Sequence, residues 1–242
     1  MSAPPRHILA VILKFPEPGR VKTRLAAEIG DEQAAAVYHE LVAQTLCYLP
    51  WEYVDVWLCF DPPERSAEVQ AWLTPMIPFQ GRAQFVPQSS GDLGDRMRAV
   101  MEAAFRQPDT ASLTFVGTDC PDMRWPVLVI RQRMRDENID AVFGATLDGG
   151  YYLLAMWRPC PELFRNIPWS TEHTLSASLE AAELAGLKVH LLKGKLRDID
   201  TLDDLQHWRT NEHYRSHDAT SPAPPLHGAG VGWTYVGKAL SP

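Results

Sequence analysis

The chain has 242 residues, of which 45% are hydrophobic, and this length and composition suit one globular α/β domain. Its formal net charge of −7 argues against a nucleic-acid partner or an anionic membrane surface. Its four cysteines are widely scattered, so the sequence predicts neither a zinc site nor a disulfide framework. The longest apolar run, ILAVIL, falls far short of the ~20 residues of a membrane span and lacks signal-peptide features, so we expect a cytoplasmic protein.

Strand and helix patterns alternate along the chain. The first half predicts strands at 7–15, 52–60, 83–88 and 112–119, and helices at 31–49, 63–73, 91–105 and 125–138. The second half predicts two strands within 140–157, a helix at 174–187, short strands at 188–193 and 196–200, and a helix at 202–217. Repeated β-α units predict a three-layer α/β/α fold with a mostly parallel central sheet. We expect a single domain at 1–217 and a Pro- and Gly-rich tail at 218–242.

Polar motifs follow the predicted strands at their carboxyl ends, where open α/β sheets bind ligands. These motifs are PEPGRVKTR, SSGDLGDR, GTDCPD, LDGG and DIDT. Because the carboxyl ends of parallel strands share one edge of a sheet, the sequence predicts a single active site there.

The first motif belongs to the stretch KFPEPGRVKTRL, which places three cations directly after a buried strand. Gly19 lets the backbone approach a ligand closely, Lys22 is a point charge, and Arg20 and Arg24 can form bidentate contacts with phosphate. A solvated basic turn is the alternative interpretation. No glycine directly precedes Lys22, so the stretch is not the phosphate-binding loop of a P-loop NTPase.

Acidic residues in the later motifs are candidate metal ligands. Asp119 and Asp200 end predicted strands, and hard cations such as Mg²⁺ or Mn²⁺ bind one or two carboxylates together with phosphate and water oxygens. The pattern fits Asp198 equally well as a metal ligand and as a structural residue. Asp122 and Asp204 are predicted helix caps, the latter in a T-x-x-D capping box.

Two further motifs are candidate substrate contacts. Gly91, Asp92 and Leu93 begin a predicted helix, and they favour either contact with a nucleobase or ribose or an ordinary helix N-cap. Asp148 is a candidate general base or a turn residue, and its neighbours Gly149 and Gly150 leave room for a substrate. The other candidates for the acceptor side are Tyr151, Trp169 and His173, each of which also suits a structural role.

Taken in order, KFPEPGRVKTRL, GDLGDRM, GTDCPDM, LDGGYYLL, PWSTEHTL and LRDIDTLDDL resemble the motifs of a known family over residues 7–208. That family consists of bacterial candidate glycosyltransferases associated with radical-SAM or selenodomain proteins, and it is a branch of the GT-A superfamily of nucleotide-diphospho-sugar transferases. The layout is also similar to phospholactate guanylyltransferases and molybdenum-cofactor nucleotidyltransferases. The chain departs from the family in having Gly144-Ala145-Thr146 before the DGG, and a single Asp119 where many GT-A enzymes have D-x-D.

The resemblance implies a role for each motif. It places Gly19, Arg20, Lys22 and Arg24 on the phosphates, Gly91, Asp92 and Leu93 near the base or ribose, and Asp119 and Asp200 on the metal. It places Asp148, Gly149 and Gly150 beside the acceptor. Lys22 and Asp148 are the residues that we expect to act in catalysis.

Three functions follow as hypotheses. In the first, a transferase that depends on Mg²⁺ or Mn²⁺ uses a nucleotide-diphospho-sugar, and an acceptor hydroxyl attacks the anomeric carbon of the sugar. In the second, a nucleotidyltransferase joins an NTP to a phosphorylated small molecule and releases pyrophosphate. In the third, the protein binds nucleotides without catalysis. The sequence leaves the base, the sugar, the acceptor, the stereochemical outcome and the oligomeric state open.

Overall fold

The structure is a computed structural model, and it describes residues 5–123 and 138–210. Nearly all of the helix predicted at 125–138, the end of the one predicted at 202–217 and the whole tail at 218–242 lie outside the described residues. The cap predicted for Asp122 belongs to the first of these helices, so it stays a prediction.

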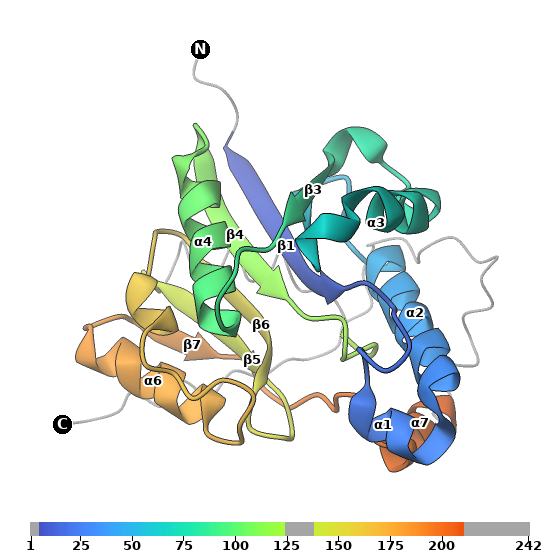
Figure 1. The fold of residues 1–242 in the computed structure, drawn as a ribbon. Coiled ribbons are helices and arrows are strands. Elements are labelled where there is room, and N and C mark those ends of the chain that lie inside the picture. The colour runs from blue at the N-terminus through green and yellow to red at the C-terminus, as the bar shows by residue number, and fades with distance from the viewer. Residues whose placement is uncertain (1–4, 124–137, 211–242) are drawn as a thin grey trace, which may run out of the picture.

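Within the described residues, a seven-stranded sheet has the order β3-β2-β1-β4-β6-β5-β7 (Figure 1). The strands are β1 Arg6–Lys14, β2 Asp55–Asp61, β3 Ala83–Pro87, β4 Thr110–Val116, β5 Ala141–Ala145, β6 Tyr151–Met156 and β7 Val189–Leu191. β6 is antiparallel to both of its neighbours, β4 and β5, whereas the other pairs are parallel. The mostly parallel sheet predicted from the β-α alternation is confirmed.

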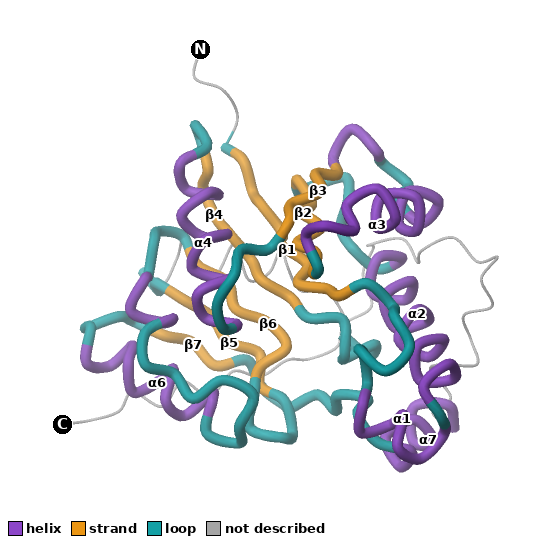
Figure 2. The backbone as a smooth tube through the Cα atoms, in the orientation of Figure 1, coloured by secondary structure: helices purple, strands orange, loops and turns teal. Residues whose placement is uncertain are grey.

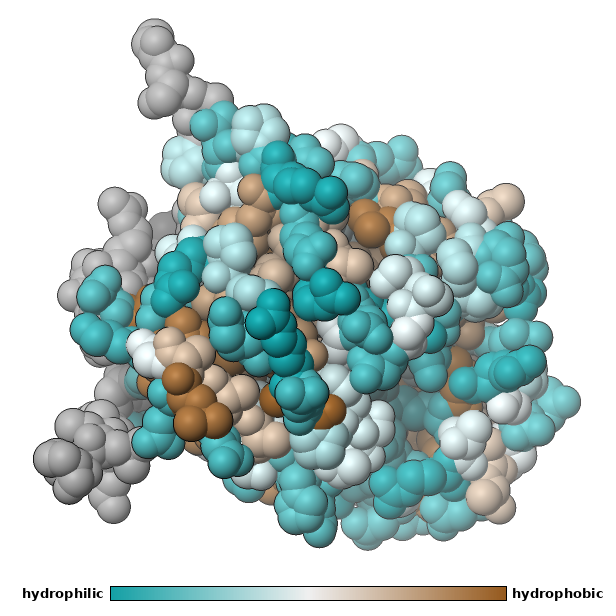
Figure 3. Space-filling model, turned by 60° about the vertical axis from the view of Figure 1, so that its left-hand side comes forward, coloured by the Kyte–Doolittle hydropathy of each residue, from teal (hydrophilic) through white to brown (hydrophobic). Residues whose placement is uncertain are grey.

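Helices flank the sheet, as the separation of purple helices and orange strands in Figure 2 shows. They are α1 Thr23–Ile29, α2 Asp31–Cys47, α3 Ser66–Leu73, α4 Leu93–Arg106, α6 Thr174–Leu184 and α7 Leu202–Thr210. None of the helices in the described part of the chain combines the length and apolar character of a membrane span. On the face in Figure 3, hydrophilic residues cover most of the surface and hydrophobic residues form small separate areas.

β1 shows how the two faces of the sheet are covered. Side chains of a strand alternate between its faces, and in β1 Leu9 and Val11 belong to one core cluster while Ile8 and Ala10 belong to another. The first cluster contains side chains of α2 and α3, and the second contains side chains of α4 and α6. Both faces are therefore buried under helices, which gives the predicted three-layer α/β/α architecture.

A third, smaller core cluster joins the two ends of the domain. Leu25 of α1 and Leu41 of α2 are buried with Ile199 and with Trp208 of α7. The Leu202 N–H also donates a hydrogen bond of 3.0 Å to Glu28 in α1. Because Ile199 directly precedes Asp200 and α1 directly follows Lys22, this cluster brings two distant motifs together.

The segment predicted as a strand at 196–200 is not a sheet strand. Leu196 forms one isolated bridge with Thr146, and beyond it the Ile199 N–H donates a 2.9 Å hydrogen bond to the carbonyl of Asp119. The segment therefore runs beside the loop after β4 without entering the sheet ladder. β4 itself ends at Val116, so Asp119 lies in the following loop rather than at the strand end. The predicted capping box of α7 is confirmed, since Thr201 and Asp204 exchange hydrogen bonds.

The third cluster supplies a test of how α7 stabilises the fold. Trp208 is 2% exposed, so Trp208→Ala should lower the free energy of unfolding by about 3–5 kcal/mol, mostly through the cavity that it leaves. Urea denaturation followed by circular dichroism measures the change. Leu184→Ala is the control, because that side chain is 83% exposed and its loss should change stability by less than about 0.5 kcal/mol. Equal stabilities for the Trp208 variant and the parent would contradict the assigned packing.

Candidate functional site

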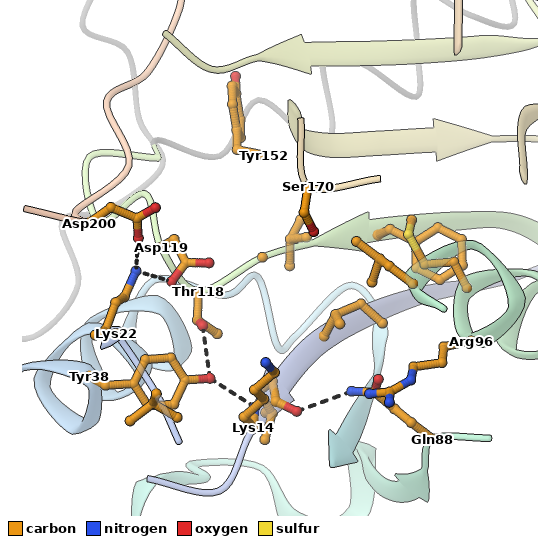
Figure 4. A pocket seen from close by; sticks show the side chains of 18 of the residues that line it. Lys14, Lys22, Tyr38, Gln88, Arg96, Thr118, Asp119, Tyr152, Ser170 and Asp200 are labelled. Atoms are coloured by element: carbon orange, nitrogen blue, oxygen red, sulfur yellow. Dashed lines mark hydrogen bonds and ion pairs between the residues drawn. The ribbon is translucent and has the colours of Figure 1, made fainter. Parts of the chain in front are cut away.

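A cavity of about 760 Å³ opens at the edge of the sheet where β1 and β4 end and β6 begins (Figure 4). Eight charged residues are among those that line it: Lys14, Arg20, Lys22, Arg24, Asp92, Arg96, Asp119 and Asp200. The uncharged polar residues of the lining include Tyr38, Gln88, Tyr152 and Ser170. The polar motifs after β1, β3 and β4 and the one before α7 thus share one cavity, as their positions after the predicted strands indicated.

Lys22 lies at the point where three of these segments meet. Its ammonium forms ion pairs with Asp119 and, at 3.0 Å, with Asp200 (Figure 4). The Lys22 side chain is only 4% exposed, whereas the two carboxylates are about half and one third exposed. Burial lowers the pKa of Lys22, but the charges of Asp119 and Asp200 outweigh it, so the pKa lies above its usual value. The ammonium therefore stays charged at neutral pH.

The loop after β1 directs Lys22 inward. Its turn is closed by a 3.0 Å hydrogen bond from the Arg20 N–H to the Glu17 carbonyl, and Val21 is buried in the core. Lys22 itself has φ 48° and ψ 45°, a left-handed conformation that is uncommon for a residue with a side chain. Its carbonyl accepts a 2.8 Å hydrogen bond from Ala26, which starts α1.

Tyr38 of α2 joins the ends of β1 and β4. Its hydroxyl accepts a 2.8 Å hydrogen bond from the Lys14 N–H and a 3.3 Å hydrogen bond from the Thr118 hydroxyl. Burial, and then the charge of Asp119, raise the pKa of Tyr38 to about 12, so it remains a neutral phenol. Sequence reasoning did not select Tyr38, because one tyrosine on the apolar face of a helix looks like an ordinary core residue.

The other predicted phosphate contacts differ in their surroundings. Arg20 and Arg24 line the cavity, and Arg24 is 70% exposed with its guanidinium 3.7 Å from Asp200. Gly19 shapes the turn with φ 76° but is not among the lining residues. Lys14, which the sequence analysis did not select, also lines the cavity although it begins the same motif.

Gly91, Asp92 and Leu93 line the cavity on the side of α4. Asp92 accepts a 2.9 Å hydrogen bond from the Asp95 N–H, so the N-cap interpretation is confirmed and the residue also faces the cavity. Gly91 has φ 108°, and a Cβ there would lie 2.6 Å from the Asp95 carboxylate. This position therefore requires glycine, which keeps the backbone of the loop open toward the cavity.

The end of β2 holds both cavity loops in place. Arg96 pairs with Asp61 at 3.1 Å and donates a 3.1 Å hydrogen bond to the Gly91 carbonyl. On the other side, the Arg65 guanidinium lies 4.0 Å from the centre of the Phe15 ring, and it pairs with Glu17 at 3.2 Å. Neither contact follows from sequence spacing, because each joins segments far apart in the chain.

Gln88, another residue that sequence reasoning missed, joins β1 and β2 beneath the cavity. Its side-chain amide donates to the Leu13 carbonyl at 3.1 Å and to the Cys59 carbonyl at 2.7 Å. Because both amide hydrogens are used by backbone carbonyls, the orientation of this buried side chain is fixed. Its only sequence signal is its position between a strand and the SSGDLGDR motif.

The DGG turn lies outside the cavity lining. Asp148 accepts hydrogen bonds from the Gly150 N–H at 2.9 Å and from the Thr146 hydroxyl, which is the geometry of a turn residue. A Cβ on Gly149 would lie 2.1 Å from the Glu172 carbonyl, so this glycine permits close packing against the loop before α6. Asp148, Gly149 and Gly150 are not among the cavity-lining residues.

Of the other acceptor candidates, Tyr151 alone lines the cavity. Its ring packs against Phe143 and Trp169 at centroid distances of 5.1 and 6.4 Å. Trp169 fills the space over Gly94, where a Cβ would lie 2.3 Å from the indole nitrogen. The His173 side chain is 71% exposed beside Glu172. Ser170 and Tyr152, which the sequence analysis did not select, also line the cavity.

Asp198 lies beside the DGG turn, and burial and the charge of Asp148 raise the pKa of Asp198 to about 6. Among the described residues, no group of three or more His, Cys, Asp or Glu side chains is placed to hold a metal ion. Asp119 and Asp200 are a pair of carboxylates that converge on one cation, the ammonium of Lys22.

The fold and the cavity define an α/β protein of the nucleotide-diphospho-sugar transferase type. The chain belongs to the family described as "Uncharacterized protein conserved in bacteria (DUF2064)", which matches residues 48–171. It is 30% identical to a candidate nucleotide-diphospho-sugar transferase from Desulfovibrio desulfuricans G20, with a TM-score of 0.71 and coverage of 89% of this chain and 96% of that one. The predicted place within this superfamily is confirmed.

More distant structures share the fold alone. A 4-diphosphocytidyl-2C-methyl-D-erythritol synthase from Anaerococcus prevotii has a TM-score of 0.52 at 12% identity, covering 84% of this chain and 96% of that one. A cytidylyltransferase from Leptospira borgpetersenii has the same TM-score at 11% identity, covering 83% and 84%. No curated protein matches the sequence.

The raised pKa of Asp198 leads to a prediction about pH. The native state favours the protonated form, so it binds more protons than the unfolded chain between the ordinary value of 3.8 and about 6. The contribution of Asp198 to stability is therefore lost as the pH rises through this window. Asp198→Asn should remove that loss, so that the variant gains stability relative to the parent on going from pH 4 to pH 7.

Urea denaturation in EDTA at a series of pH values measures the difference, and Asp203→Asn, at an exposed position, is the control. Parallel curves for the parent and Asp198→Asn would contradict the prediction.

Proposed function

We propose that the protein is a metal-dependent transferase that takes a nucleotide-diphospho-sugar as donor and transfers the sugar to a small-molecule acceptor. The observation that carries this proposal is the Lys22 ammonium between Asp119 and Asp200, at the wall of a cavity that Arg20 and Arg24 also line. The relative from Desulfovibrio desulfuricans, 30% identical over nearly the whole domain, supports the choice of donor.

The cationic side of the cavity suits a diphosphate. Within the described residues, Lys14 and Arg20 have no acidic partner, and the contact between Arg24 and Asp200 at 3.7 Å is long and exposed. These three side chains are available to phosphate oxygens, and each charge-assisted hydrogen bond contributes about 1.5–3 kcal/mol. Their charges stabilise the negative charge that develops on the departing nucleoside diphosphate.

Asp119 and Asp200 fit Mg²⁺ or Mn²⁺, because both already converge on one cation and both keep exposed oxygen atoms. Such ions bind one or two carboxylates and take their remaining ligands from phosphates and water. When bound there, the metal would neutralise charge on the diphosphate of the leaving group.

The acceptor side is assigned to Tyr151, Tyr152 and Ser170, which line the cavity across from the carboxylates. Figure 4 shows Tyr152 and Ser170 above Asp119 and Asp200, with the hydroxyl of Tyr152 directed away from Lys14. Burial raises the pKa of Tyr152 to about 12, so its hydroxyl group remains neutral. Proton abstraction from the acceptor by Asp148 stays a prediction, as do acceptor contacts by Gly149, Gly150, Trp169 and His173.

Nucleotidyl transfer is the second candidate function. Its supporting observation is that Lys14, Arg20 and Arg24 together offer three positive charges, which suit a triphosphate as well as a diphosphate. In this reaction a phosphate oxygen of the acceptor forms a bond to the α-phosphorus of the NTP, and the bond to the departing pyrophosphate breaks.

Thermal unfolding with a set of UDP-sugars, GDP-sugars and NTPs, each with Mn²⁺, tests the proposal. A ligand that binds only the native state adds about 2.7 kcal/mol of stability at a hundredfold excess over its Kd. Arg20→Met should weaken that ligand about tenfold or more through the loss of a phosphate contact. Arg165→Met is the matched control, because this exposed arginine lies outside the cavity lining.

Product analysis separates the two reactions. Release of a nucleoside diphosphate supports sugar transfer, whereas release of pyrophosphate supports nucleotidyl transfer. Binding without either product, with Asp119→Ala and Asp200→Ala unchanged in affinity, would favour a non-catalytic module. If no nucleotide stabilises the protein, all three hypotheses fail.

A further inference from the structure

The same carboxylate oxygens that suit a metal are already bound to a cation of the protein. The Lys22 ammonium contacts Oδ1 of Asp119 and lies 3.0 Å from Oδ1 of Asp200. With 4% of its side chain exposed, Lys22 is shielded from solvent, so water and salt screen its charge weakly.

A metal ion and the ammonium cannot both occupy this position. Mg²⁺ lies about 2.0–2.1 Å from its carboxylate oxygens, so an ion on the two Oδ1 atoms would be in contact with the ammonium. Two like charges so close repel strongly, and the low exposure of Lys22 prevents solvent from weakening the repulsion. The two carboxylates carry a charge of −2, which one ammonium and one divalent ion together exceed.

We propose that Lys22 is an internal counter-cation that competes with the divalent metal for the pair of Asp119 and Asp200. The metal displaces the ammonium efficiently only when a phosphate group is present to accept it. This inference rests on the proposed function. It adds that metal and nucleotide bind cooperatively, so that each raises the affinity of the protein for the other.

The local structure allows such an exchange without a change of backbone. The backbone of Lys22 is fixed by buried Val21 on one side and by the 2.8 Å hydrogen bond from Ala26 to its carbonyl on the other. Its four-carbon side chain is flexible, and a lysine ammonium can meet an oxygen from many directions. Since Lys22 lines the cavity beside Arg20, rotation of this side chain moves its charge from the carboxylates toward bound phosphate.

Arg24 provides the matched comparison within the same loop. It also carries a positive charge near Asp200, but at 3.7 Å and with 70% of its side chain exposed. Solvent screens this charge, so its removal should change metal affinity little. If Lys22 competes with the metal, removal of its charge should raise metal affinity more than removal of the charge of Arg24 does. A general change in the charge of the loop would affect both variants equally.

Titration of the protein with Mn²⁺ alone, with free Mn²⁺ counted by electron paramagnetic resonance, tests the competition. Lys22→Met and Lys22→Gln should bind Mn²⁺ at least about tenfold more tightly than the parent, because a repelling charge in contact with the metal is gone. Arg24→Met should remain within about threefold of the parent. Addition of a nonhydrolysable nucleoside triphosphate or a nucleoside diphosphate should tighten Mn²⁺ binding to the parent much more than to Lys22→Met.

Equal Mn²⁺ affinities for the parent and the Lys22 variants would overturn the proposal, as would equal effects of Lys22→Met and Arg24→Met. If Lys22→Met unfolds without metal, its Mn²⁺-dependent refolding followed by circular dichroism gives the same information, and a failure of Mn²⁺ to refold it also counts against competition. Nucleotide binding to the parent is measured separately by thermal unfolding. A parent that binds nucleotide but shows no competition refutes only this inference, whereas one that binds no nucleotide refutes the proposed function.

Discussion

The site depends on the ion pairs that Lys22 makes with Asp119 and Asp200. They join three segments: the loop after β1, the loop after β4 and the stretch before α7. Lys22 and Asp200 are 178 positions apart in sequence, so their contact depends on the tertiary fold. Burial of the ammonium is tolerable because two carboxylates compensate its charge, and an uncompensated ammonium there would strongly destabilise the fold.

The surrounding structure keeps this arrangement rigid at the edge of the sheet. Tyr38 joins the ends of β1 and β4, and the cluster around Trp208 holds the segment before α7 against α1. Arg65 and Arg96 connect the end of β2 to the two cavity loops on either side. The loops that line the cavity are thus fixed by residues that face away from a ligand as much as by those that face it.

The basic residues of the cavity fall into two groups, those paired with acids of the protein and those left for a ligand. Lys22 is committed to carboxylates of the protein, and Arg96 is committed to Asp61. Lys14, Arg20 and the exposed Arg24 remain for an anionic ligand. The cavity lining contains five basic and three acidic residues, so a protein with a formal net charge of −7 presents a locally cationic cavity.

The sequence by itself determined the layers, the mostly parallel sheet and the position of most polar motifs at one edge of the sheet. The reason is that hydrophobic periodicity, and the place of each motif directly after a strand, can be read from neighbouring residues. The sequence also predicted that Lys22, Asp119 and Asp200 lie near one another, and the structure brings their side chains into contact. The tertiary structure alone decided that Lys22 contacts the two acids directly and that Asp148 is held within a turn outside the cavity lining. It also selected Tyr38, Gln88 and Ser170 for the cavity wall. The physical reason is that side-chain direction and pairing across distant segments depend on packing, which spacing along the chain does not specify.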